Sequence, residues 1–342
     1  MNEKTVEPTT LDRRGRPLRD LRISVTDRCN LRCSYCMPAE EYGEDYGFAS
    51  RGEILTFEEV ERVVSAFAAL GVRKLRITGG EPLLRAQLHQ LIAKLNAIDG
   101  IDDIAITTNG LLLESKAGEL AAAGLRRVTV SLDSLDTDVA RTMSGRESRV
   151  DQTLAGISAA KKAGLGAAKI NCVVQRGVND HTILELLEYF RGSDHIVRLI
   201  EFMDVGTRNG WRLDQVMPLR ELIDQIDARF PIEPVGPNYI GEVARRYQYK
   251  DGAGEIGIIA SVTAPFCTDC QRARVTTDGS VYNCLFASEG LDLRSPIRAG
   301  ASDDELRALI GANWNAREDR YSELRGVAGG SIDRVEMNKM GG

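Results

Sequence analysis

The chain has 342 residues, a formal net charge of −6, 43% hydrophobic residues and 27% charged residues, a composition that suits a globular domain with a smaller extension. The net charge provides no overall basic field for nucleic acid, and no run approaches the roughly 18 apolar residues of a membrane span. The polar N-terminus lacks the apolar core of a secretion signal, so we expect a cytoplasmic protein without nucleic-acid or membrane partners.

The first two thirds of the chain alternate between strand and helix patterns. Residues 1–20 are polar and predict a flexible lead-in. Apolar, β-type runs follow at 21–25, 72–78, 101–107, 126–132, 167–174 and 195–203. Helical periodicity appears between them, at 56–71, 85–98, 114–124, 150–164 and 182–192. This alternation implies parallel strands joined by right-handed crossovers. Six units are too few to close an eight-fold barrel, so the sequence predicts an α/β fold, a partial (β/α)6 open barrel over residues 21–230.

The pattern changes in the last third of the chain. A helix is expected at 219–230, and the proline- and glycine-rich stretch 231–242 marks a boundary. Short strand-like pieces follow, and "TDGS" at 277–280 is typical of a hairpin turn. We therefore expect residues 231–342 to form a mixed α+β extension.

The seven cysteines fall into two trios and one single residue. Cys29, Cys33 and Cys36 have the spacing C-x3-C-x2-C, whereas the second trio, spaced C-x2-C-x13-C, lies in the predicted extension. Cys172 stands alone in an apolar run and is interpreted as a buried strand residue. Because structural disulfides are rare in the cytoplasm, clustered cysteines indicate metal binding or catalysis. The second trio consists of Cys267, Cys270 and Cys284.

Neither trio has an obvious fourth ligand for zinc. A structural zinc site needs four protein ligands. The only histidines, His89, His181 and His195, are far from both trios in sequence, and Cys172 could complete one trio at most. Two incomplete trios favour two [4Fe–4S] clusters, each with one iron left for an exchangeable ligand. A non-enzymatic zinc-binding module remains the alternative.

The first trio, with Tyr35 before its third cysteine, resembles the cluster motif of radical S-adenosylmethionine enzymes. The resemblance implies that S-adenosylmethionine binds the open iron and is cleaved to a 5′-deoxyadenosyl radical. "RITGGEPLL" at 76–84 agrees with it. Gly and Pro there also suit an ordinary strand-to-helix turn. The functional interpretation, a backbone that holds the amino group of S-adenosylmethionine, is favoured because the second strand lies next to the cluster loop.

Two arginines follow the second cysteine pair closely. Arg272 and Arg274 alternate along a predicted strand and so share one face, and a guanidinium matches the geometry of phosphate. A solvated edge strand is the plainer alternative. Further cations at predicted strands suggest an anionic substrate in the barrel: Arg22, Lys74, Arg76, Lys169 and Arg198.

The whole set of motifs, from about Leu21 to Gly342, resembles the GTP 3′,8-cyclase family, whose reaction begins molybdenum cofactor biosynthesis. "FCTDCQRARV" at 266–275 and the terminal Gly341–Gly342 pair add to the resemblance. It implies that the deoxyadenosyl radical abstracts the 3′ hydrogen of GTP. The resulting C3′ radical then adds to guanine C8, and reduction gives 3′,8-cyclo-7,8-dihydro-GTP. A Gly-Gly end is by itself typical of a frayed terminus, but in this family it reaches into the active site.

The resemblance also implies residue roles. The first trio holds the radical cluster, the second holds an auxiliary cluster that meets the guanine, and Arg272 and Arg274 share in catalysis. The residues implied to contact S-adenosylmethionine are Tyr35, Gly80, Ser131 and Met203. Those implied to bind GTP are Arg22, Arg76, Thr107, Lys169, Arg272, Ala273 and Arg274.

The implied partners are a second copy of the chain in a homodimer, reduced flavodoxin or a similar electron donor, and a downstream cyclic pyranopterin monophosphate synthase. One further alternative stays open from the sequence. Another radical S-adenosylmethionine enzyme with an auxiliary cluster, for instance one that modifies peptides, would share the N-terminal half.

Overall fold

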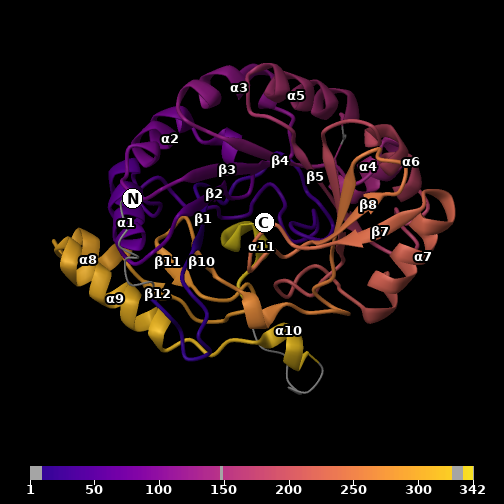
Figure 1. Ribbon diagram of the computed structural model, residues 1–342. Helices are drawn as coiled ribbons and strands as arrows, with labels where there is room; N and C mark the ends of the chain where they lie inside the picture. Colours follow the sequence, from indigo (N-terminus) through magenta and orange to yellow (C-terminus); the bar gives the residue numbers. More distant parts are fainter. Residues whose placement is uncertain (1–9, 147–148, 326–333, 342) are drawn as a thin grey trace, which may run out of the picture.

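The strands and helices of the first two thirds alternate as predicted. The computed structural model describes residues 10–146, 149–325 and 334–341 (Figure 1). The six predicted strands are β1 (Asp20–Ser24), β2 (Lys74–Thr78), β3 (Asp103–Thr108), β4 (Arg127–Ser131), β5 (Lys169–Val174) and β6 (Ile196–Glu201).

Helices surround the strands on the outside of the curved sheet (Figure 1). The predicted ones are α1 (Phe57–Ala69), α2 (Leu88–Asn96), α3 (Leu113–Ala122), α5 (Val150–Lys162), α6 (Ile183–Phe190) and α7 (Leu219–Arg229). The sequence prediction missed α4 (Thr137–Ser144), which Asp136 caps and Gly145 ends. This helix is short and mostly polar, and only Ala140, Met143 and Ser144 are buried, so no apolar run marks it in the sequence.

The C-terminal third mixes strands and helices, as expected. Its strands are β7 (Ile232–Val235), β8 (Arg245–Tyr249), β9 (Glu255–Ile259), β10 (Arg272–Val275), β11 (Ser280–Tyr282) and β12 (Leu291–Asp292). Its helices are α8 (Arg294–Arg298), α9 (Asp303–Asn315), α10 (Tyr321–Leu324) and α11 (Met337–Met340). The predicted hairpin turn is confirmed, because β10 and β11 pair antiparallel on either side of it.

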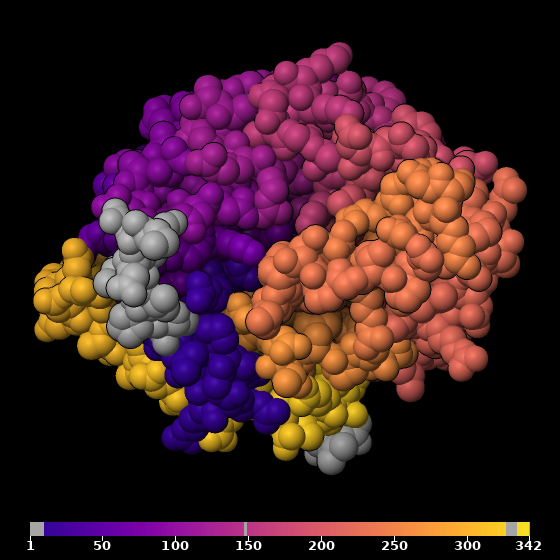
Figure 2. All heavy atoms as spheres, in the orientation of Figure 1, coloured from indigo at the N-terminus to yellow at the C-terminus, as the bar shows by residue number. Residues whose placement is uncertain are grey.

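All strands form one 12-stranded sheet in the order β12-β11-β10-β1-β2-β3-β4-β5-β6-β9-β8-β7. Strands β1 to β6 are parallel neighbours, β10 adds to β1 in parallel, and β9 adds to β6 in parallel. The outermost strands β12 and β7 do not pair with each other, so the predicted open barrel is confirmed. In Figure 2 the orange C-terminal surface lies directly beside the magenta β/α units. The extension therefore enlarges the same sheet at both edges, and a domain division at 230–231 stays a prediction.

Alternate residues of the strands face different surroundings. In β1, Leu21 and Ile23 are at most 1% exposed in the core, whereas Arg22 between them lines the central cavity. In β2, Leu75 and Ile77 belong to the same core. This period of two is the reason for the apolar runs in the sequence, and it sends the intervening polar side chains to the inside of the barrel.

The segment before β1 differs from the expected flexible lead-in. Residues 1–9 lie outside the described residues, but Asp12, Arg16 and Leu18 are buried. The backbone N–H of Thr10 donates to the carbonyl of Leu70, and that of Leu18 donates to the carbonyl of Thr10. Some of the polar side chains that predicted flexibility instead form buried contacts, such as the pair between Arg16 Nε and Asp12 Oδ2 at 2.6 Å. Among the described residues, no helix combines the length and the apolarity needed to cross a bilayer.

Candidate active site

The first cysteine trio lies on the loop after β1 and lines the central cavity. Cys29, Cys33 and Cys36 are partly exposed, and the backbone N–H of Cys36 donates to the carbonyl of Cys33 at 3.0 Å. The buried side chain of Arg32 donates to the carbonyls of Cys29, at 2.9 Å, and Tyr42, at 2.7 Å. These bonds hold the loop so that the three thiols face one space.

Two glycines after β2 allow this loop to pack closely. A Cβ on Gly79, whose φ is +154°, would lie 2.4 Å from the carbonyl oxygen of Thr26, and one on Gly80 would lie 2.4 Å from that of Arg28. The N–H of Gly80 donates to Thr26 at 2.7 Å. Any larger residue would push the cysteine loop away, so the "TGG" stretch has a packing role beside its place on the cavity wall.

The neighbouring wall carries a buried tyrosine and carboxylate. The hydroxyl of Tyr35 donates to Asp133 Oδ2 at 2.8 Å, and the backbone N–H of Val173 donates to Asp133 Oδ1 at 2.9 Å. Burial raises the pKa of Asp133 to about 6. Ser131 and Met203 line the cavity together with this pair. This end of the cavity therefore combines thiols, a polar wall and a thioether.

The second trio surrounds the other end of β1 and β10. Cys267 lies on the 3-10 turn η3 (Cys267–Asp269), Cys270 precedes β10, and Cys284 follows β11. Arg272 Nη2 lies 3.4 Å from Cys270 Sγ, and Arg317 Nη2 lies 3.3 Å from it. Burial raises the pKa of this thiol, but the two guanidiniums outweigh burial and lower the pKa of Cys270 to about 6. A thiolate is thus favoured at Cys270.

The topology places the two trios at opposite ends of the barrel. Strands β1 and β10 are parallel, with Asp20 opposite Arg272. Cys29 comes after β1, whereas Cys270 comes just before β10, so the two loops leave opposite ends of neighbouring strands. One cavity of about 370 Å³ is lined by all six cysteines. A ligand between them would contact both ends of the strands.

Cations fill the space between the trios. Arg274, Arg22 and Arg76 lie side by side on β10, β1 and β2, and all three line the cavity. Burial, and then the charges of Arg274 and Arg76, hold the pKa of Arg22 well below its usual value. Within the described ranges, none of the three has a carboxylate partner at ion-pair distance, a costly arrangement that a bound polyanion would relieve.

Further cations continue this surface on other strands. Lys74 Nζ lies 3.5 Å from the centre of the Tyr239 ring. Burial, followed by Arg198 and Arg127, lowers the pKa of Lys169 to about 8. The sequence analysis missed Arg127 and Tyr239, although Arg127 alternates with Thr129 and Ser131 on one face of β4, which was a usable signal.

The cavity collects the predicted site residues with one exception. Ala273 has a side chain that is 0% exposed in the core, so only its backbone could contact a ligand. The predicted residues on the cavity wall are Cys29, Cys33, Cys36, Cys267, Cys270, Cys284, Tyr35, Gly80, Ser131, Met203, Arg22, Arg76, Thr107, Lys169, Arg272 and Arg274.

The remaining cysteine and the histidines lie elsewhere. Cys172 is 0% exposed in β5, and its thiol donates to the carbonyl of Asp133 at 3.4 Å, so its interpretation as a buried strand residue is confirmed. None of the three histidines is among the described cavity-lining residues. Neither trio therefore gains a fourth side-chain ligand from Cys172 or from a histidine.

The donor sets fit clusters better than single ions. In the described part of the chain, no three Cys, His, Asp or Glu side chains converge closely enough for one metal ion. A cubane cluster does not require such convergence, because each thiolate binds a different iron. Beside the second trio, Arg16 Nη2 is buried without a hydrogen-bond partner. A sulfide or thiolate of a cluster would give this donor an acceptor.

The C-terminal tail also reaches the cationic surface. Arg274 Nη1 donates to the carbonyl of Gly341 at 2.5 Å and to that of Met340 at 3.3 Å. Gly341 is buried with φ +73°, and a Cβ there would lie 2.2 Å from Thr78 Cγ2. The tail is thus packed at Gly341 rather than frayed, while Gly342 lies outside the described residues.

Comparisons with known proteins agree with this site. A family model described as Radical SAM superfamily matches residues 23–190, and one described as Molybdenum Cofactor Synthesis C matches residues 195–323. A GTP 3′,8-cyclase of Xanthomonas campestris pv. campestris is 52% identical over 97% of this chain and 97% of its own. The chain belongs to the GTP 3′,8-cyclase family. The predicted resemblance is confirmed, and neither the peptide-modifying nor the zinc-binding alternative is favoured.

Other relatives and structures agree. The GTP 3′,8-cyclase of Staphylococcus haemolyticus is 50% identical over 97% of this chain and 98% of its own. The crystal structure of Streptococcus suis SuiB bound to S-adenosylmethionine has a TM-score of 0.59 at 16% identity, over 86% of this chain and 68% of SuiB. At this identity the likeness shows a shared fold and nothing more.

Proposed function

We propose that this protein converts GTP to 3′,8-cyclo-7,8-dihydro-GTP, the first step of molybdenum cofactor biosynthesis, in the cavity between the two cysteine trios. One observation carries the proposal: both trios line a single cavity whose middle is cationic, and among the described residues no carboxylate pairs with Arg22, Arg76 or Arg274. Such a cavity suits a small molecule that carries several negative charges.

As a radical S-adenosylmethionine enzyme, the protein would hold its first cluster on Cys29, Cys33 and Cys36. Bound there, the cluster would supply the electron that cleaves S-adenosylmethionine to a deoxyadenosyl radical. The residues that would hold the adenosyl and methionyl parts line the same end: Tyr35, Gly80, Ser131 and Met203.

The cations between the trios would hold the triphosphate of GTP. Arg22, Arg76 and Arg274 form a row across three strands, and Arg272 and Lys169 lie on the same wall. Thr107 adds a hydroxyl beside Arg76. Fixing the triphosphate in this way would leave the ribose between the radical source and the second trio, so that C3′ and C8 are held close enough to react.

The second trio would hold an auxiliary [4Fe–4S] cluster on Cys267, Cys270 and Cys284, with its open iron toward the guanine. Arg16 and Arg317, which line this end, would donate to its sulfur atoms. We further propose a cytoplasmic homodimer that takes electrons from reduced flavodoxin or a similar donor and passes its product to a cyclic pyranopterin monophosphate synthase.

The decisive experiment is metal analysis and turnover under anaerobic conditions. We expect about eight irons per chain, since two cubane clusters hold four irons each. With a strong reductant, 5′-deoxyadenosine formation should depend on GTP. Zinc in place of iron would reject the proposal, and S-adenosylmethionine cleavage unaffected by GTP would favour another substrate.

A double variant tests the phosphate site. Replacing Arg272 and Arg274 by Ala should weaken GTP binding at least about 100-fold, because two charge-assisted contacts of ~1.5–3 kcal/mol are lost. S-adenosylmethionine binding should change little. Calorimetric titration of both ligands measures this, with the exposed Arg220→Ala as control. Equal losses for both ligands would make the two arginines structural.

A further inference from the structure

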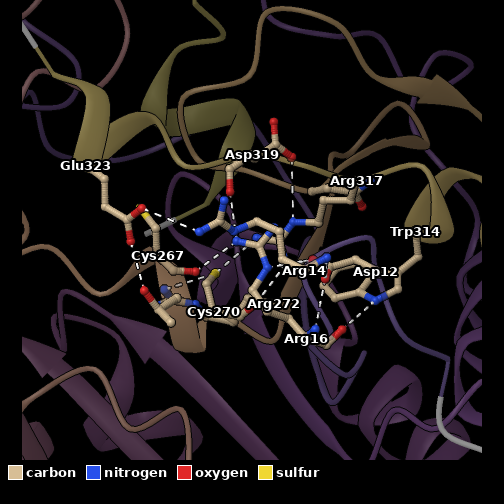
Figure 3. A network of polar contacts seen from close by, with 12 residues as sticks. Asp12, Arg14, Arg16, Cys267, Cys270, Arg272, Trp314, Arg317, Asp319 and Glu323 are labelled. Atoms are coloured by element: carbon tan, nitrogen blue, oxygen red, sulfur yellow. Dashed lines mark hydrogen bonds and ion pairs between the residues drawn. The ribbon is translucent and has the colours of Figure 1, made fainter. Parts of the chain in front are cut away.

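Arg317, a buried arginine outside the predicted site, donates hydrogen bonds to the second trio. Arg317 follows α9 and is only 4% exposed. Its Nη1 donates to the carbonyl of Cys270 at 2.8 Å, and its Nη2 donates to Cys270 Sγ at 3.3 Å (Figure 3). One guanidinium therefore binds both the backbone and the sulfur of a single cysteine.

The surroundings fix the orientation of this guanidinium. Asp12 Oδ2 lies 3.5 Å from Arg317 Nη1, and the Trp314 ring centre lies 4.5 Å from its Cζ. The backbone N–H of Arg13 donates to the carbonyl of Arg317 at 3.3 Å. The guanidinium of Arg317 is buried and is held by a carboxylate, an aromatic ring and the main chain, so it has little freedom to move. Its N–H group is therefore preorganised to donate to the sulfur of Cys270.

A second arginine completes the grip from the N-terminal segment. Arg16 Nη1 donates to the carbonyls of Cys267, at 2.8 Å, and Asp319, at 2.7 Å, while its Nε pairs with Asp12 at 2.6 Å (Figure 3). Asp12 thus holds both Arg16 and Arg317. Segments from the two ends of the chain meet at the backbone of the second trio, although nothing in their sequences marks them as partners.

We propose that Arg317 is a positioning residue that raises the reduction potential of the auxiliary cluster through its N–H···S bond to Cys270. The proposal rests on the auxiliary cluster of the proposed function. Reduction adds one electron to the cluster and makes its thiolates more negative. A fixed N–H donor and a nearby positive charge stabilise that reduced form more than the oxidised form, which shifts the couple upward.

The test isolates the auxiliary cluster in the full-length chain. In a Cys29→Ala, Cys33→Ala, Cys36→Ala background, about four irons should remain. Arg317→Lys keeps a positive charge near Asp12 but cannot bond both the carbonyl and the sulfur of Cys270. Arg13→Ala is the matched control, because it removes only an exposed pair with Glu318 in the same region.

The readout is a reductive titration with dithionite and mediators, followed by electron paramagnetic resonance. At the potential where half of the auxiliary cluster in the parent is reduced, Arg317→Lys should have about a tenfold lower ratio of reduced to oxidised cluster. This corresponds to a midpoint potential lower by about 59 mV for a one-electron couple. Arg13→Ala should match the parent, and iron content should stay the same in all three.

The outcomes separate the two proposals. If the parent protein, which lacks the first cysteine trio, holds no four-iron cluster, the proposed auxiliary cluster itself is contradicted. A cluster whose midpoint is unchanged in Arg317→Lys overturns the role of Arg317 and leaves the function intact. If Arg317→Lys loses iron, Arg317→Gln, which removes the charge and keeps only an amide NH2 group, is titrated instead and should show the same lower ratio of reduced cluster. Loss of iron in both would assign Arg317 a purely structural role and also overturn the proposal.

Discussion

Lys169 lines the central cavity with Arg198, Arg127 and Arg76 nearby. Burial, and then the charges of Arg198, Arg127 and Arg76, lower the pKa of its ammonium to about 8. A triphosphate bound nearby would favour the charged form and return the pKa toward its ordinary value. Ligand binding and protonation of this one residue are therefore linked.

The linkage gives a pH dependence of GTP affinity. Below about pH 8, Lys169 is charged whether or not GTP is bound, so the affinity for GTP is at its highest and nearly constant. Above about pH 8, Lys169 is mostly neutral in the free protein, so GTP binding must be accompanied by the uptake of a proton. We expect affinity to fall about tenfold from about pH 7 to about pH 9, which calorimetry measures. In Lys169→Gln binding should be weaker at neutral pH, and this dependence should disappear. The same slope in both proteins would contradict the role of Lys169.

Gly80 gives a second prediction for a single residue. In Gly80→Ala the new methyl would meet the carbonyl of Arg28 at 2.4 Å and displace the loop of the first trio. Iron content should fall from about eight to about four per chain, with the auxiliary cluster retained. Gly118→Ala in α3 is the control, since nothing lies within 4 Å of its Cβ. It should stabilise the protein by ~0.5–1 kcal/mol. An unchanged iron content in Gly80→Ala would contradict this prediction and show that the loop can shift to accommodate the methyl group.

At the scale of elements, the position of the tail helix α11 depends on a carboxylate in the loop after β6. Asp204 accepts hydrogen bonds from Tyr321 at 2.6 Å, Arg325 at 3.0 Å and Arg334 at 2.9 Å. Thr207 in the same loop donates to Glu336 at 2.9 Å. These contacts join the loop after β6 to the residues that lead into α11, and so they fix where Gly341 meets Arg274.

Asp204→Asn should release the tail without unfolding the barrel. It removes the charge that pairs with Arg325 and Arg334, and charge-assisted hydrogen bonds contribute ~1.5–3 kcal/mol each. Amide hydrogen exchange in α11 should become about 10- to 100-fold faster, while β1 to β6 stay protected. The exposed Asp138→Asn, which breaks a pair with Arg141, should leave α11 unchanged. Uniformly faster exchange across the chain would instead indicate global destabilisation.

At the scale of the whole molecule, the barrel separates two tasks along its axis. Strand β1 has five residues and so spans about 16 Å between the two cysteine loops. The wall near the first trio is thiol, tyrosine and thioether, whereas the middle is cationic. The two ends should therefore be separable by mutation.

Replacing Cys267, Cys270 and Cys284 by Ser tests this separation. Iron should fall to about four per chain, and S-adenosylmethionine affinity should stay within about threefold, because its end of the cavity is untouched. Product formation from GTP should be lost. Anaerobic iron analysis and ligand titration measure the two effects, with Cys172→Ser as the control outside both trios. Loss of S-adenosylmethionine binding together with the second cluster would show that the ends are coupled.

The sequence predicted what depends on local pattern. Alternation such as Leu21, Arg22, Ile23 identified the strands, and short cysteine spacings identified both trios. It missed what depends on distant partners: Arg16 and Arg317 meet only in the folded chain, and Asp204 finds its arginines more than a hundred residues away. The helix α4 was missed because it is short and mostly polar, so no apolar run marks it in the sequence.

The path of residues 260–271 has a consequence for biosynthesis. This segment leaves β9 at one side of the sheet and enters β10 at the other, carrying Cys267 and Cys270 across the opening. Until it emerges from the ribosome, β1 lacks its neighbour β10 and exposes an unpaired edge to other nascent chains. At ~5–20 residues per second that exposure lasts roughly 10 to 50 s. Chains released before β10 is made should therefore aggregate through this edge. Expression yield should improve when translation is fast compared with the rate at which chains collide.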